Sequence, residues 1–168
     1  MSPIFTRSPD EIKAARWPHE ILLINLVFNH VFVFVVTLGV IKSIPMMIGL
    51  TPLISFSIIA YILVKQKQIQ ASDASFFLKS HWKIAAARNR WFLYLLIFVC
   101  VISGGGFYLF TSFGLSKITL WALLIGIGLL PFMVALLTLV TLGSDSMNIA
   151  RDGKLPNNFL AKNPPPAA

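Results

Sequence analysis

The sequence has few charged residues, few acids and one cysteine. Only 12% of its 168 residues are charged, 57% are hydrophobic and the mean hydropathy is +0.79, whereas soluble domains carry about 25% charged residues. The lone Cys100 excludes a disulfide within one chain, and its place in an apolar block is typical of a buried, unreactive thiol. The composition therefore predicts an integral membrane protein.

The groups that membrane enzymes and metalloproteins use are also scarce. No acid lies deep in an apolar block, so a pair of carboxylates at one bond is not expected there. Of the three histidines only His30 lies in such a block, which does not favour haem held by two facing histidines, and no Cys or His run has zinc spacing. The sequence predicts no catalytic residue, no cofactor and no metal site.

Four apolar blocks are the main feature that is present, at about 21–44, 46–64, 91–110 and 118–142. Each approaches or exceeds the roughly 20 residues that cross a ~30 Å hydrocarbon core. Because the connections within each pair are short, the paired helices should be antiparallel neighbours. We predict an all-α bundle of four transmembrane helices in two antiparallel hairpins. It has an N-terminal segment at 1–20, a loop at 65–90 and a tail at 143–168.

Several residues predict where helices start, bend or stop. Ser8 followed by Pro9, Asp10 and Glu11 is typical of a helix start. Pro52 is expected to kink the second block, and Gly126 and Gly128 followed by Pro131 are expected to form a flexible point in the fourth. The run 104–106, which is all glycine, either allows close helix approach or frays the third helix. Gly143 is expected to stop the fourth helix.

The basic residues predict the orientation. Three Lys or Arg lie in 1–20, six in 65–90 and three in the tail, and only Lys42 and Lys117 lie on the other side. The positive-inside rule then places both termini and the central loop in the cytoplasm. We therefore expect a multi-pass membrane protein with a cytoplasmic N-terminus and a cytoplasmic C-terminus.

The first block carries Asn25, Asn29 and His30 among apolar residues. The two asparagines are four residues apart and share a helical face, with His30 beside it. Facing lipid would leave these groups without hydrogen bonds, so they should face other helices or a wet cavity. Two interpretations stay open: hydrogen bonding between helices, or the ligand or proton site of an oligomeric transporter or channel.

The polar stretch 71–91 divides the chain into two apolar halves. Its pattern predicts a helix lying at the membrane interface before the third span, capped by Ser72 or Asp73. It could bind anionic lipid headgroups on the cytoplasmic side, or it could dock a partner protein. A nucleic acid is not needed to explain its charge. The candidate binding residues are Lys79, His81, Trp82, Lys83, Arg88, Arg90 and Trp91.

This stretch and the tail carry a resemblance to a known group of proteins. The pattern of His81, Trp82, Lys83, Arg88 and Trp91, together with the tail run 149–156, resembles small uncharacterised four-helix bacterial inner-membrane proteins of the Tic20-like kind. The Arg falls one residue later than in that pattern, and an alanine replaces its usual Gln. The resemblance implies the four-span layout and no assigned activity.

The sequence as a whole favours a non-enzymatic membrane subunit or assembly partner of a larger complex, or a homo-oligomer. The outward loops are short and carry few charged residues, whereas the cytoplasmic side carries many basic and aromatic residues. The alternative is the small-molecule or ion transporter, based on the polar face of the first block. A third hypothesis is a membrane enzyme that uses His81 on a phospholipid headgroup.

Overall fold

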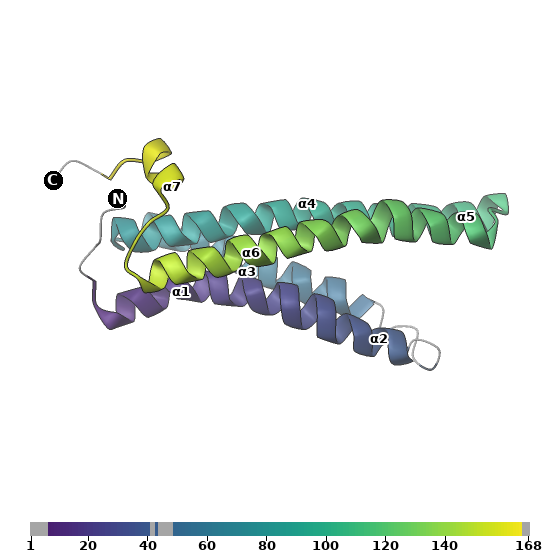
Figure 1. Cartoon of the computed structure of the whole chain (residues 1–168), viewed down its shortest axis with the longest axis horizontal. Coiled ribbons are helices and arrows are strands. Elements are labelled where there is room, and N and C mark those ends of the chain that lie inside the picture. The colour runs from purple at the N-terminus through teal and green to yellow at the C-terminus, as the bar shows by residue number, and fades with distance from the viewer. Residues whose placement is uncertain (1–6, 41–42, 44–48, 166–168) are drawn as a thin grey trace.

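The computed structural model describes residues 7–40, 43 and 49–165, and every element in them is helical. Long helical segments run side by side, with the start of α1, the α3–α4 connection and α7 at the same end (Figure 1). We call this end the polar end. The elements are α1 Pro9–Leu23, the π-helical η1 Ile24–Val33, α2 Phe34–Val40, α3 Leu50–Ala71, α4 Phe76–Phe113, α5 Lys117–Ala122, the π-helical η3 Leu123–Leu129, α6 Leu130–Arg151 and α7 Asn157–Lys162. The predicted all-α class is confirmed.

Among the described residues, three helices are long and apolar enough to cross a membrane. They are α3 with 22 residues, α4 with 38, and the continuous run of α5, η3 and α6 with 35. At 1.5 Å per residue each reaches ~30 Å or more. The first predicted span, 21–44, is not among them, and its described part is divided between α1, η1 and α2. Residues 41, 42 and 44 of that span lie outside the described residues.

The first helical segment begins as predicted. Ser8 is the N-cap of α1, its Oγ accepts a hydrogen bond of 3.2 Å from the Glu11 amide, and Pro9 occupies the first turn. The helix then passes without a break from α1 through η1 into α2. The boundary expected near residue 20 is therefore not a break in the backbone.

The predicted loop at 65–90 is mostly helical. Helix α3 continues to Ala71 and α4 begins at Phe76, so the connection is only 72–75. The prediction of a separate interfacial helix is wrong, because residues 76–90 form about the first four turns of α4 and continue without a break into its apolar part. No glycine or proline interrupts this stretch. Ser75, not Ser72 or Asp73, is its N-cap, accepting a bond from the Leu78 amide.

Two glycines allow helices to approach closely. A Cβ on Gly106 would lie 3.1 Å from Leu123 Cδ2, and α4 continues past it without fraying. A Cβ on Gly143 would lie 3.0 Å from Leu23 Cδ2. The prediction that Gly143 stops the fourth helix is wrong, because its missing side chain lets α6 pack on α1 and the helix runs on to Arg151.

The helix ends and prolines follow from backbone chemistry. Helix α6 is closed by Gly153 at φ 67°, where the Lys154 amide bonds the Ile149 carbonyl at 3.0 Å, a glycine C-cap of the Schellman type. Pro52 is the third residue of α3, where its missing N–H has no intrahelical partner, so the kink of an interior proline does not arise there. Gly126 and Gly128 lie in the π-helical η3, and Pro131 follows in the first turn of α6.

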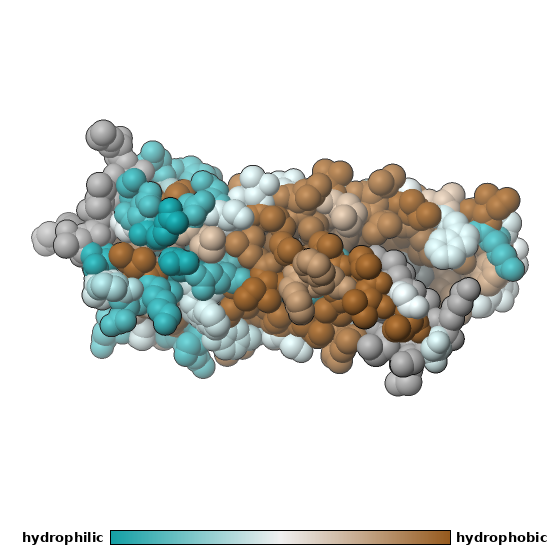
Figure 2. All heavy atoms as spheres, turned by 60° about the horizontal axis from the view of Figure 1, so that its bottom comes forward, coloured by the Kyte–Doolittle hydropathy of each residue, from teal (hydrophilic) through white to brown (hydrophobic). Residues whose placement is uncertain are grey.

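The apolar residues form two clusters. The main core draws on α1, η1, α3, α4 and α6 and contains Leu22, Leu26, Ile59, Phe92, Leu96, Phe132, Leu136 and Leu139. A smaller cluster at the polar end, which we call the polar-end cluster, contains Ala15, Phe77, Ala150 and Leu155. Figure 2 shows hydrophobic residues covering the middle of the molecule and hydrophilic residues gathered at the polar end. The tail is therefore packed onto the bundle through Leu155.

Candidate functional site

Two histidines from α1 and α4 meet inside the polar end. His19 Nε2 lies 3.2 Å from His81 Nδ1, the rings are nearly perpendicular, and both residues are fully buried. His81 Nε2 lies 3.0 Å from the Lys154 carbonyl oxygen. A carbonyl oxygen only accepts, so His81 Nε2 carries the hydrogen and its Nδ1 accepts from His19 Nε2–H. The result is a directed chain from His19 through His81 to the tail.

The surroundings keep both imidazoles neutral. Burial lowers the pKa of His81 to about 4, although the hydrogen bond to the Lys154 carbonyl acts to raise it. Burial also lowers the pKa of His19 well below its ordinary value. The positive charge of Arg88 acts in the same direction on both pKa values. Phe77 lies edge-on to His81 with ring centroids 4.7 Å apart. Protonation would place a second charge beside Arg88 in an apolar surrounding, which disfavours imidazolium.

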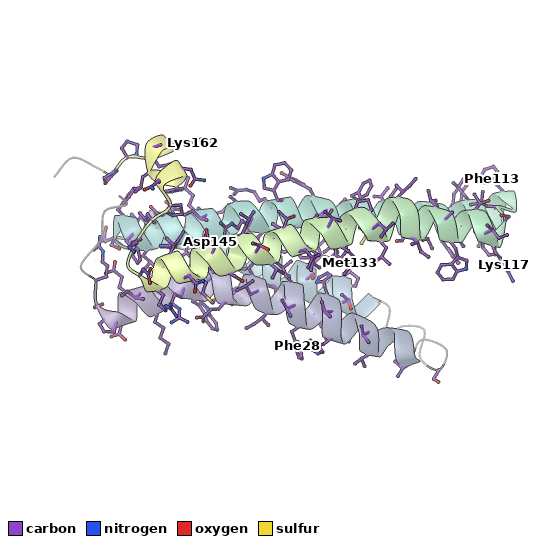
Figure 3. All side chains as sticks on the ribbon, viewed as in Figure 1. Phe28, Phe113, Lys117, Met133, Asp145 and Lys162 are labelled. Atoms are coloured by element: carbon purple, nitrogen blue, oxygen red, sulfur yellow. The ribbon has the colours of Figure 1, made fainter. Side chains whose placement is uncertain are left out.

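Arg88 itself is partly withdrawn from solvent. Burial lowers the pKa of its guanidinium, whereas Asp145 of α6 acts to raise it. Its Nη1 has no hydrogen-bond partner within the described residues, and neither has His19 Nδ1. Figure 3 shows Asp145 on the part of α6 near the polar end. Arg88 thus has an electrostatic partner inside the protein and is not simply a surface cation.

The histidine pair was not predicted from the sequence. His19 and His81 are 62 residues apart and both were expected to be separate interfacial residues. Only the packing of α1 on α4 brings them together, and no local spacing signals it. Across the part of the chain that the structure describes, no group of three His, Cys, Asp or Glu side chains comes together as a metal site.

The second polar cluster contains the three residues predicted in the first block. Asn29 Nδ2 lies 3.1 Å from Asn25 Oδ1, 2.9 Å from the Thr51 carbonyl and 3.0 Å from Ser55 Oγ. Asn25, Asn29 and Ser55 are at most 2% exposed. The structure therefore brings Asn25 and Asn29 together with α3, as the interpretation of bonding between helices requires.

His30 joins this cluster through the π-helical geometry. Its Nδ1 lies 3.1 Å from the Asn25 carbonyl, five residues earlier, so Nδ1 carries the hydrogen. Its Nε2 is then an acceptor, 3.3 Å from Ser55 Oγ, whose hydroxyl also lies 2.9 Å from Asn25 Oδ1. The ring packs against Phe92 and Phe132. Ser55 is the centre of the network, since it contacts all three predicted residues.

Three polar atoms of this network have no partner within the described residues. They are Asn25 Nδ2, Asn29 Oδ1 and Thr51 Oγ1, and their residues are at most 5% exposed. The network is thus well connected around Ser55, but these three atoms make no hydrogen bond in it. A buried amide without a full set of partners is less stable than one that is fully bonded.

The residues of the predicted binding face at 79–91 do not all lie on the surface. Lys83, Arg90 and Trp91 are exposed, while Lys79 and Arg88 are half-buried. His81 and Trp82 are buried at 0% and 3% exposure. Because His81 points into the protein, it does not lie on an external binding surface, and the prediction is corrected for this residue, whereas Trp82 lines an open groove on the side of the polar end.

Helix α7 covers part of the same face and was not predicted. Lys83 Nζ donates to Asn163 Oδ1 at 2.7 Å and lies 5.8 Å from the centroid of the Phe159 ring. A small hollow lies between this helix and the hairpin, and Lys79, Ser80 and Phe159 are among the residues that line it. The tail after residue 155 therefore contacts α4 instead of leaving the protein directly.

An open groove lies on the side of the polar end. It has a volume of about 420 Å³ and runs between α1, α3 and the start of α4. Its walls are mostly apolar or aromatic, with cations and one acid at the rim. The lining residues are Asp10, Lys13, Ala14, Trp17, Tyr61, Lys65, Ile69, Leu78 and Trp82.

Comparison of the sequence with protein-family models and with curated proteins gives no match, and comparison of the structure with solved structures gives none either.

Proposed function

We propose that the chain is a four-span protein of a bacterial inner membrane that acts as a non-enzymatic subunit or assembly partner of a larger membrane complex. In addition to the three helices that are long and apolar enough to cross a membrane, the first helical segment, α1 to α2, would also cross it. Its residues Leu22 and Leu26 belong to the same core cluster as residues of α3, α4 and α6. Helix α1 packs on α4 and α6, and η1 packs on α3, so the segment would cross the bilayer beside the other three helices. The π segment changes its local winding and leaves its continuity intact.

We further propose that the polar end faces the cytoplasm. The hairpin between α3 and α4 and the tail carry most of the basic residues, whereas the far end carries Lys117 beside the turn after Phe113 (Figure 3). Short loops with this imbalance follow the positive-inside rule. Both termini would then be cytoplasmic.

The observation that carries the docking function is a set of cations without acidic partners on the α3–α4 hairpin. We call these the hairpin cations: Lys65, Lys67, Lys79, Lys83 and Arg90. The ion pairs that the described residues form are Arg7–Glu11, Arg16–Glu20 and Lys154–Asp152, and none involves a hairpin cation. The hairpin has one acid of its own, Asp73. Its charge is therefore available to an acidic partner surface or to lipid headgroups.

The two alternative functions receive less support. A transporter would use Asn25, Asn29 and His30, but these side chains are buried and bonded to one another and to α3. An enzyme acting on lipid headgroups would use His81, which is fully buried and bonded through both ring nitrogens. The resemblance to Tic20-like proteins agrees with a four-span layout and adds no activity.

Co-purification with charge-reversal variants tests the docking function. The tagged full chain is isolated from native membranes in mild detergent, beside a Lys67→Glu/Arg90→Glu variant and a Lys117→Glu control at the far end. We expect specific membrane proteins to accompany the wild type and the control, and to be lost with the double variant. A lone homo-oligomer in all three preparations would contradict the proposal.

Labelling with a membrane-impermeant maleimide tests the orientation. In a Cys100→Ala background, Lys67→Cys and Lys117→Cys place one thiol at each end of the molecule. In intact cells whose outer membrane is permeable to the reagent, only Lys117→Cys should react, and in inverted inner-membrane vesicles only Lys67→Cys. The opposite pattern would reverse the orientation, and reaction of both thiols on one side would contradict the four-span topology.

A further inference from the structure

We propose that the groove between α1, α3 and α4 binds one glycerophospholipid, with the lipid phosphate held between Lys13 and Lys65. This inference depends on the protein lying in a membrane but not on the identity of any partner protein. The groove shares only Lys65 with the hairpin cations.

The position of the groove fits the headgroup level of a bilayer. Trp17 and Tyr61, which line it, are each 46% exposed and lie where the polar end meets the apolar middle. Trp and Tyr are enriched at this depth because each has an apolar ring and a polar tip. The nearly buried Trp82 forms an aromatic wall behind them. A lipid phosphate and glycerol would therefore be at their natural depth in this groove.

The charges at the rim complement a phosphodiester. Lys13 and Lys65 are exposed, and neither takes part in an ion pair within the described chain. Arg16, one turn away on α1, is instead held by Glu20 at 2.8 Å. Asp10 lies at the rim as well, where the ammonium of an ethanolamine headgroup could be placed. Two cations and one acid suit a group with one negative phosphate and, optionally, one positive amine.

The apolar surface continues from the groove toward the middle of the bundle. Ile24 and Phe28 follow Trp17 on the first helical segment and are 54% and 59% exposed. Figure 3 shows Phe28 pointing away from the bundle. Trp17, Ile24 and Phe28 are seven and four residues apart, a spacing that places them on one side of a helix. Acyl chains that leave the groove would therefore contact a hydrophobic surface. A volume of about 420 Å³ lies within the usual range of small-molecule sites, about 300–1,000 Å³.

Native mass spectrometry of the full chain tests the site. The protein in detergent is titrated separately with phosphatidylglycerol, phosphatidylethanolamine and soluble glycerol phosphate. Three forms are compared: the wild type, Lys13→Gln/Lys65→Gln in the groove, and Lys67→Gln/Arg90→Gln as a control with the same loss of charge outside it. The wild type should retain one phospholipid after loosely held lipid has been removed.

The groove variant should bind that lipid about thirtyfold more weakly, because each interfacial cation contributes about 1 kcal/mol. The control should keep the wild-type affinity, and glycerol phosphate alone should not compete. Equal losses in both variants would overturn the site in favour of diffuse charge, and competition by glycerol phosphate would reassign it to a free phosphate ester. Asp10→Asn should weaken phosphatidylethanolamine only.

Trp17 supplies a second measurement that needs no binding constant. In a Trp82→Phe/Trp91→Phe/Trp121→Phe background, Trp17 is the remaining tryptophan. Phosphatidylglycerol brominated near the headgroup end of its chain should quench its fluorescence, and Lys13→Gln/Lys65→Gln should reduce the quenching. Strong quenching that the groove variant leaves unchanged would show lipid beside Trp17 that does not depend on the two cations, and would overturn the proposal.

Discussion

His19 and His81 join two helices and the tail through one chain of hydrogen bonds at the polar end. The chain runs from His19 Nε2 to His81 Nδ1 at 3.2 Å and from His81 Nε2 to the Lys154 carbonyl at 3.0 Å. Both bonds are donated by an Nε2–H, and the first also requires an unprotonated Nδ1 on His81 to accept it. Protonation of His81 would therefore remove its bond to His19, while its bond to the Lys154 carbonyl would remain.

The first prediction concerns stability against pH. The unfolded chain binds protons as pH falls below about 6.5, whereas folded His81 does so only near pH 4, so the free energy of unfolding should decrease between these values. The shift of His81 corresponds to on the order of 3 kcal/mol. Unfolding in detergent, followed by tryptophan fluorescence at several pH values, measures the effect.

The matched variant for this measurement is His19→Gln/His81→Gln, which keeps polar side chains but removes the titrating groups. It should be less stable at pH 7 and should depend less on pH between 6.5 and 4. An unchanged pH dependence would show that groups other than these two histidines govern the acid response.

The second prediction concerns the crossing of α1 and α6. Gly143→Val should lower the free energy of unfolding by about 1–3 kcal/mol, because the new side chain would overlap Leu23. Gly104→Val is the control, since no atom lies within 4 Å of a Cβ placed there. Denaturant titrations of both variants in the same detergent compare them. Similar losses would argue against tight packing at Gly143.

The third prediction concerns the network around Ser55. Asn29→Leu and Ser55→Ala should be coupled by about 0.5–2 kcal/mol in a double-mutant cycle, because Asn29 Nδ2 donates to Ser55 Oγ at 3.0 Å. Ser57→Ala provides the control, since Ser57 Oγ bonds only the Leu53 carbonyl of its own helix among the described residues. Additivity of Asn29→Leu with Ser55→Ala would mean that the bond between these two side chains does not help to join the helices.

The fourth prediction concerns α7. Lys83→Gln should speed amide hydrogen exchange in residues 157–162 by roughly fivefold, because it removes the Asn163 bond and the contact with the Phe159 ring, together worth about 1 kcal/mol. Lys79→Gln, one turn earlier on α4, should leave exchange in α7 unchanged. Faster exchange in both variants would indicate a general effect of charge.

Much of the fold follows from local patterns in the sequence. The apolar blocks predicted the helices because their length and composition decide where a chain can lie in a bilayer. The start of α1 was predicted because the capping by Ser8 and the position of Pro9 depend only on residues within the first turn. The shared face of Asn25 and Asn29 was predicted because it depends only on helical spacing.

The features that were missed depend on contacts between distant segments. The His19–His81 pair and the contact of Gly143 with Leu23 both arise where α1 crosses another helix. Gly143 was interpreted as a stop because glycine ends many helices, whereas α6 ends at Gly153. The basic stretch looked separate from the third span, but burial of Ala85 and Ala86 against the bundle keeps it in line with α4.

The π-helical segment η1 has a consequence for the surface that the first helical segment presents beyond it. Its hydrogen bonds span five residues rather than four, as if one residue had been inserted into an α-helix. Deleting one residue between Ile24 and Val33 would restore an ordinary helix. The wide turn absorbs that extra residue, so the residues after the deletion would keep nearly the same faces, whereas the same deletion within α1 would turn them by about 100°. Helix α2, which packs on η1, would thus keep its place after a deletion in η1 and lose it after one in α1.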